Sequence, residues 1–263
     1  MLRENVGTII TCIISYLIGS INFGVIICKF KHIDIKKIGS GNPGATNVSR
    51  YLGKKIGALV AVLDGLKPIL ATFVAMIFLA IKINEFRQTS MVISAFFALI
   101  GHCWPIYHKF KGGKAVSTFT GMLLIANVLI CLMFIGIWFI ILKISKKVSV
   151  SSLLSAIIVT ILLWIPIFSG NITYIKNGLD FYQKAYDNNL YFNFYNTHYM
   201  AIKSSFCDSY FTICIIITLS CIILVIRHWS NIKKILRGEE LNYNDSKKIA
   251  EVELEKITKE NKK

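Results

Sequence analysis

Residues 115–144, AVSTFTGMLLIANVLICLMFIGIWFIILKI, form a run of thirty positions whose only charged side chain is Lys143. As one helix this run would reach about 45 Å, well beyond a hydrocarbon core of about 30 Å. We therefore divide it into a short helix with a polar entry over 116–126 and a full span over 128–142. Runs of this kind are typical of multi-span membrane proteins.

Comparable apolar runs recur along the chain. Of the 263 residues, 54% are hydrophobic, a share that soluble domains of this size rarely reach. The other predicted spans are 7–27, 56–81, 89–107, 150–168 and 210–226. The sequence thus predicts an all-α, polytopic integral membrane protein with seven transmembrane helices.

The charge distribution sets the predicted orientation. The net charge is +16, and the basic residues lie mainly in loops and the tail, so anionic lipid headgroups explain the charge better than nucleic acid does. Six spans would place Lys143, Lys146 and Lys147 outside the cell. Seven spans put every basic loop on one side, with the N-terminus outside and the C-terminus cytoplasmic.

The same pattern predicts the domain organisation. Residues 1–240 form one seven-span membrane domain, in which 169–208 is an external loop insertion, and 241–263 is a charged cytoplasmic tail. The seven cysteines include no CxxC pair, which predicts buried apolar thiols rather than a disulfide framework or a zinc site.

The loop after the first span, IGSGNPGATNVSR at 38–50, is the strongest functional signal. Glycines let backbone N–H groups close around an anion, and Arg50 can grip a phosphate with two parallel hydrogen bonds. A GSGN stretch alone is more often an ordinary turn. The whole block favours a binding site, with these candidate residues: Ser40, Gly41, Asn42, Thr46, Asn47 and Arg50.

A second polar loop, KFKGGKAVST at 109–118, precedes a predicted helix. Its spacing is not that of a P-loop, so nucleotide hydrolysis is not indicated. The two glycines can still wrap an anion at the N-terminus of the helix, where the helix dipole favours negative charge. The candidates here are Gly112, Gly113, Lys114 and Thr118. Lys109 and Lys111 fit a positive-inside anchor equally well.

Several ionisable residues lie in or beside the spans. Asp64 and Lys67 share one helical face inside the second span, where charged groups are costly and point either to function or to a structural ion pair. His228 follows the last span and could take a proton or hold a phosphate oxygen. His102, at the end of the third span, is a secondary candidate because a lone histidine there is more often structural.

Other familiar catalytic patterns are absent. No histidine has an aspartate five positions later, which argues against acyltransferases that use a His-x4-Asp pair. The sequence has neither a G-x-S-x-G elbow nor the aspartate-rich metal motif of the CDP-alcohol transferases. We expect no metal and no organic cofactor.

The polar motifs together resemble those of the bacterial integral-membrane acyl-phosphate:glycerol-3-phosphate acyltransferases. The resemblance covers roughly 14–240 without the outer loop, and rests on the block at 39–50, the block at 101–114, Leu63-Asp64-x-x-Lys67, and Arg227-His228 through Asn231-Ile232 to Gly238 and Glu240. Four positions depart from the usual pattern: Ala115, Ser117, Pro68 and Asn22. Of these, Ala115 could alter the backbone of the glycine loop.

The resemblance implies seven spans, an active site at the cytoplasmic face and a place in the bacterial cell membrane. It implies transfer of a fatty acyl group from acyl phosphate to the 1-hydroxyl of glycerol 3-phosphate, giving lysophosphatidic acid for phospholipid synthesis. A soluble enzyme that makes the acyl phosphate is an implied partner. The positions that the family uses around its substrates are Ser40, Arg50, Lys114, His228 and Asn231, with a phosphate-binding stretch at 112–114, and Glu240 is a secondary candidate.

An acyl phosphate has a good leaving group, so we expect the glycerol hydroxyl to attack directly, with no acylated enzyme. Ser40 and Asn231 would orient the hydroxyl, and His228 or a substrate phosphate oxygen would take its proton. The alternatives are a transporter or channel for phosphate or a phosphate ester, and a non-catalytic scaffold. A transporter should carry polar groups on both faces, whereas these motifs converge on one.

Overall fold

The computed structural model describes residues 5–81, 83–165, 210–245, 249, 250 and 252. All regular elements in these ranges are helical, which confirms the predicted all-α class. The external loop predicted at 169–208 and most of the tail lie outside the described residues. The elements are α1 (Val6–Ser20), α2 (Phe23–Phe30), α3 (Ala45–Leu52), α4 (Lys54–Ala80), η2 (Asn84–Phe86), α5 (Met91–Cys103), η3 (Ile106–His108), α6 (Val116–Ala126), α7 (Val128–Ser145), α8 (Val148–Leu163), α12 (Tyr210–Arg227) and α13 (Trp229–Leu236).

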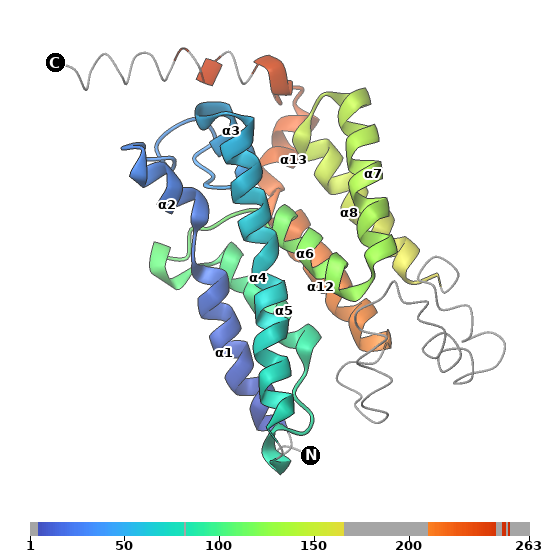
Figure 1. The fold of residues 1–263 in the computed structure, drawn as a ribbon. Helices are drawn as coiled ribbons and strands as arrows, with labels where there is room; N and C mark the ends of the chain where they lie inside the picture. The colour runs from blue at the N-terminus through green and yellow to red at the C-terminus, as the bar shows by residue number, and fades with distance from the viewer. Residues whose placement is uncertain (1–4, 82, 166–209, 246–248, 251, 253–263) are drawn as a thin grey trace.

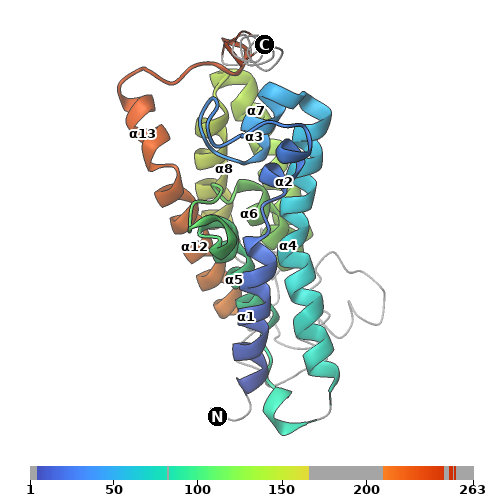
Figure 2. The same cartoon turned by 90° about the vertical axis from the view of Figure 1, so that its left-hand side faces the viewer.

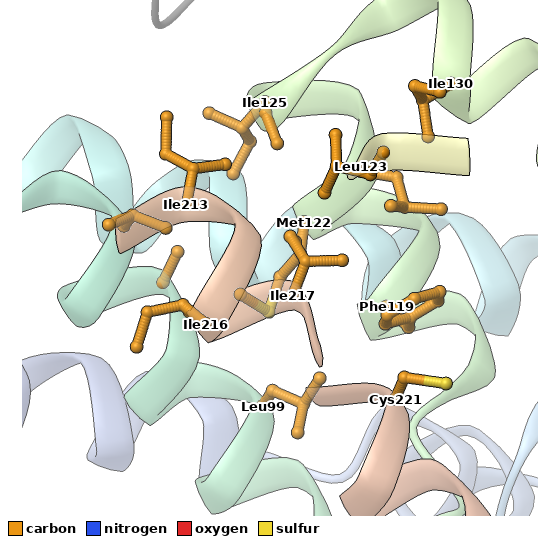
Figure 3. Packing of buried hydrophobic residues seen from close by; sticks show 14 of the residues in the cluster. Leu99, Phe119, Met122, Leu123, Ile125, Ile130, Ile213, Ile216, Ile217 and Cys221 are labelled. Atoms are coloured by element: carbon orange, nitrogen blue, oxygen red, sulfur yellow. The ribbon is translucent and has the colours of Figure 1, made fainter. Parts of the chain in front are cut away.

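The long helices run side by side as a bundle, with the N-terminus at one end and α2, α3 and α13 at the other (Figures 1 and 2). Helices α1, α4 and α5 pack against one another, α6 lies against α4, and α7 pairs with α8. The main core joins α5, α6, α7, α8 and α12, with Ala75 of α4 packed into the same cluster. Figure 3 shows Leu99 of α5, Phe119 and Met122 of α6 and Ile217 of α12 meeting within it.

Four helical segments in the described part are long and apolar enough to cross a membrane: 6–30, α4, 91–108 and α7. A fifth arises if α12 and α13, bent by 58° at their junction, count as one span. Helices α6 and α8 are apolar but shorter. The protein is a multi-pass membrane protein, while the count of seven spans and the sides of the termini remain predictions.

Two breaks occur where an asparagine caps a new helix. The predicted division of 115–144 is confirmed, because Asn127 separates α6 from α7 and its side chain accepts a hydrogen bond from the N–H of Ile130 at 3.1 Å. The predicted span 7–27 lies within the apolar segment 6–30, in which the helix breaks before Asn22, whose side chain accepts a hydrogen bond from the N–H of Val25 at 3.1 Å. An amide side chain that captures a free N–H favours a helix start over continuation.

Close packing of α1 on α5 depends on glycine. A Cβ on Gly19 would lie 2.1 Å from the carbonyl oxygen of Ala98, and a Cβ on Gly101 would lie 2.2 Å from that of Tyr16. Small residues at such crossings let backbones approach within a bilayer, where packing holds helices together. This crossing places the end of α5, and with it His102, beside the polar loops.

Candidate active site

The loop between α2 and α3 is organised from within by Asn47. This buried side chain donates to the carbonyl oxygens of Ile38 (3.1 Å) and Ile35 (3.4 Å), and its Oδ1 accepts from the N–H of Ser40 at 3.3 Å. Gly39 and Gly41 adopt φ values of 56° and 66°, which favour glycine. The amide of Asn47 therefore fixes the shape of the loop that presents Ser40, Gly41 and Asn42.

Helix α3 continues from this loop and carries Thr46 and Arg50. The Nε of Arg50 is buried and has no hydrogen-bond partner among the described residues. Its charged and phenolic neighbours are Tyr243, Tyr51 and Glu240. A buried guanidinium nitrogen without a partner costs free energy unless an acceptor arrives, so Arg50 is suited to bind an anion.

The turn at Gly112 and Gly113 lies between α5 and α12. The N–H of Gly113 donates to the carbonyl oxygen of His102 at 3.0 Å. On the other side, Arg227 donates from Nη2 to the carbonyl oxygen of Gly112 (2.8 Å) and from Nε to that of Gly113 (3.0 Å). The sequence singled out both glycines, but it did not indicate that Arg227 bonds to their carbonyls.

The N-terminus of α6 follows this turn directly. The first N–H of this helix that donates to a backbone carbonyl is that of Phe119, which bonds to Ala115 at 2.7 Å. The N–H groups of Val116, Ser117 and Thr118 make no backbone bond among the described residues. The hydroxyl of Thr118 is fully buried and also lacks a partner there. Open N–H groups at a helix start, with Lys114 beside them, can bind a phosphate.

Ala115 adopts φ 65° and ψ 6°, the left-handed conformation that usually requires glycine. Although Ala115 departs from the family pattern, its backbone therefore keeps the conformation that glycine would adopt. We expect Ala115→Gly to keep the free energy of unfolding within about 1 kcal/mol, because relief of left-handed strain offsets the greater flexibility of glycine. Ala115→Val should destabilise by about 2 kcal/mol or more, since a branched side chain fits this conformation poorly. Unfolding in detergent measures both, and equal stability of the two variants would contradict the argument.

Asn231 of α13 connects three parts of the site. Its Oδ1 accepts from Nζ of Lys114, and its Nδ2 donates to Oγ of Ser149 at 2.5 Å and to Oε1 of Glu240 at 3.2 Å. The other carboxylate oxygen of Glu240 is buried without a partner among the described residues. Ser149 was not predicted, and nothing in its sequence context distinguishes it from the other serines of that helix.

His228 lies at the junction of α12 and α13 and is only 2% exposed. Its Nδ1 lies 2.8 Å from the carbonyl oxygen of Leu224. A carbonyl can only accept, so Nδ1 carries the proton and Nε2 of the neutral ring keeps its lone pair. The positive charge of Lys114 and, more weakly, that of Arg227 act on this ring. The arrangement leaves a nitrogen base next to the cationic cluster.

Asp64, Lys67 and His102 form one buried group beneath the glycine turn. Lys67 Nζ lies 2.7 Å from Asp64 Oδ1 and 3.3 Å from His102 Nδ1, and Asp64 Oδ1 is 3.6 Å from the same ring nitrogen. Asp64 and Lys67 thus form the ion pair that the sequence offered as one of two alternatives, and His102 joins them. The Phe23 ring lies 5.3 Å from Lys67 Nζ, so the lysine charge also faces an aromatic ring.

The structure thus brings most of the candidates to one end of the bundle. Tyr243 ties that end together, because its hydroxyl meets Ser49 Oγ at 3.1 Å and its N–H donates to the carbonyl oxygen of Lys146 at 2.9 Å. In the described chain, Ser40 bonds only within its own loop and has no direct bond to the Lys114 cluster. The cluster itself comprises Arg50, Lys114, Arg227, His228, Asn231 and Glu240.

Burial lowers the pKa of Lys114 to about 8, with Glu240 opposing the shift and Arg50 adding to it. In the ligand-free protein the ammonium is lost as the pH rises through about 8. We therefore expect the affinity for a phosphate ester to fall by up to about tenfold per pH unit above that value. The dissociation constant of glycerol 3-phosphate, measured from pH 6.5 to 9.5, tests this. A flat profile would contradict it, and Lys114→Arg, which stays charged, should remove the dependence.

Comparison with known proteins places this geometry in one family. The family model described as glycerol-3-phosphate acyltransferase matches residues 9–238. A glycerol-3-phosphate acyltransferase of Mycoplasma mycoides subsp. mycoides SC is 46% identical over 237 residues, covering 89% of this chain and 92% of the relative. One of Staphylococcus aureus is 36% identical, covering 88% and 96%.

Two solved structures share the fold. The crystal structure of PlsY (YgiH), an integral membrane glycerol 3-phosphate acyltransferase in its glycerol 3-phosphate form, has a TM-score of 0.65 and 26% identity, covering 89% of this chain and 94% of that one. The lysophosphatidic acid form of the same protein has a TM-score of 0.64. The chain belongs to the glycerol-3-phosphate acyltransferase family.

Proposed function

We propose that this protein transfers a fatty acyl group from an acyl phosphate to the 1-hydroxyl of glycerol 3-phosphate, forming lysophosphatidic acid and inorganic phosphate. Family membership supports the acceptor and the acyl transfer. The observation that carries the proposal is the cationic cluster at the start of α6, where Lys114 and open N–H groups lie near Arg50. Such a site offsets the repulsion between two phosphate substrates.

The reaction needs little help with the leaving group, because an acyl phosphate is a mixed anhydride. The glycerol hydroxyl attacks the acyl carbon, the new ester C–O bond forms, and the bond from the acyl carbon to the phosphate oxygen breaks. Phosphate leaves with the electron pair and is stabilised by Lys114 and Arg50. The hydroxyl proton passes to Nε2 of His228, while Ser40 and Asn231 orient the hydroxyl. No enzyme group becomes acylated.

The acyl chain requires an apolar path to this cluster. A cavity of about 270 Å³ lies between α8 and α12 and is lined mainly by apolar side chains, among them Ile157, Ile161 and Ile222. Its lining continues to Val225 and Ile226, directly before Arg227 and His228. We assign this groove to the fatty chain, because burying methylene groups there keeps the acyl carbon near the helix junction.

The membrane arrangement belongs to the same proposal. We infer seven spans in a bacterial cytoplasmic membrane, with the N-terminus outside and the cluster on the cytoplasmic side, where the basic loops gather. The domain spans 1–240, with 169–208 as an outer insertion and 241–263 as a tail. A soluble enzyme supplies the acyl phosphate at that face.

The test is product formation by the purified protein in lipid. We expect lysophosphatidic acid from glycerol 3-phosphate with palmitoyl phosphate, and none with palmitoyl-CoA. Product from palmitoyl-CoA alone would overturn the donor assignment. Absence of product from both donors, with the protein folded, would overturn the proposed reaction.

A further inference from the structure

Arg227 donates hydrogen bonds to backbone carbonyl oxygens of the protein itself. Its fork spans two successive carbonyl oxygens of the glycine turn, and its guanidinium lies 5.6 Å from the centre of the Trp104 ring. A planar guanidinium with fixed donors suits this two-point contact in a way that a lysine ammonium does not. The charge is therefore used to hold backbone rather than left open for a ligand.

The contact to Gly113 fixes the direction of the next N–H group. In a trans peptide the C=O and N–H point in opposite directions across the plane. With the Gly113 carbonyl turned to Arg227, the N–H of Lys114 points away from Arg227, and no described group accepts a hydrogen bond from it. Without Arg227 the peptide could rotate and turn its carbonyl dipole toward a bound phosphate.

The opposite side of the turn rests on His102. A Cβ on Gly113 would lie 2.1 Å from Nε2 of His102, and a Cβ on Gly112 would lie 2.2 Å from the carbonyl oxygen of His102. The imidazole is itself held from below by Lys67 and Asp64. The Gly112–Gly113 turn thus lies between the His102 imidazole and the guanidinium of Arg227. These two contacts fix the orientation of its backbone.

We propose that Arg227 is a positioning residue that, with His102 as the opposing surface, holds the Gly112–Gly113 carbonyls away from the anion site so that the Lys114 N–H faces the substrate phosphate. This rests on the proposed function, since the phosphate is that of glycerol 3-phosphate or the acyl phosphate. Arg227 does not touch the substrate in this arrangement. Its contribution is the geometry of the turn.

Arg227→Lys separates geometry from charge. It keeps the positive charge but cannot bond both carbonyls, so we expect the KM for glycerol 3-phosphate to rise about tenfold, with a kcat change of less than about threefold. Arg227→Gln loses the charge as well and should raise the KM further. The exposed Arg87, in the turn after η2, supplies the matched control Arg87→Gln, whose kinetics should equal those of the wild type.

The thermal shift that glycerol 3-phosphate produces gives a second readout. We expect it to shrink in Arg227→Lys, while the unfolding midpoint without ligand stays close to that of the wild type. An unchanged KM and ligand shift in Arg227→Lys would overturn the inference, even if Arg227→Gln fails to fold. An inactive wild type that also shows no ligand shift would overturn the proposed function instead.

Discussion

Replacing Lys114 with methionine should lower kcat/KM for glycerol 3-phosphate by about 10²- to 10³-fold while leaving the protein folded in the membrane. The side chain is partly buried, it donates to Asn231, and it lies at the start of α6 beside the open N–H groups. In a site shielded from water, one fixed charge stabilises a phosphate far more strongly than it would at the surface. Methionine keeps the length of the side chain and removes the charge.

The control for this experiment is Lys111→Met, three residues earlier in the same loop. Lys111 is exposed, so its charge is screened by water and ions and its loss should change kcat/KM by less than about threefold. Activity and insertion are measured together, in membranes with equal amounts of each protein. Equal losses in both variants would mean that net loop charge, not the placement of Lys114, supports activity.

The sequence alone located the apolar helices and the polar loops because both signals are local. Uncharged runs define the helices, and the break at Asn127 follows from bilayer thickness together with a capping residue. The apolar run does not predict the helix break before Asn22, because it continues through that position. Only the competition between a side-chain cap and helix continuation decides the outcome there.

The site was harder to predict where it depends on contacts between distant segments. Lys114, Asn231 and Glu240 were candidates, but nothing in the chain indicated that Asn231 joins the other two and also reaches Ser149. Likewise the loop position of Asn47 suggested substrate contact, while its amide is bonded to the loop backbone. Pairings across the bundle arise from helix packing, which a single sequence does not encode as a local pattern.

His228→Asn should lower kcat by about 10²- to 10³-fold with little change in the KM for glycerol 3-phosphate. The asparagine amide can replace Nδ1 in donating to the Leu224 carbonyl, so the junction of α12 and α13 keeps its main hydrogen bond. What is lost is Nε2, the basic nitrogen to which we assign the hydroxyl proton. A loss confined to kcat is the signature of a group that acts in the transition state and not in substrate binding.

His32→Asn is the matched control, because His32 is exposed and left-handed, a conformation that asparagine adopts readily. Its kcat should equal that of the wild type. If His228→Asn keeps kcat within about threefold of the wild type, an imidazole base is not needed and the proton goes to a substrate phosphate oxygen. If both kcat and the thermal midpoint fall in His228→Asn, the contact to the Leu224 carbonyl has been disturbed. His228→Gln then serves as the second variant that separates a structural role at this contact from a role as base. The assignment of the base thus depends on whether the loss appears in kcat while the helix junction stays intact.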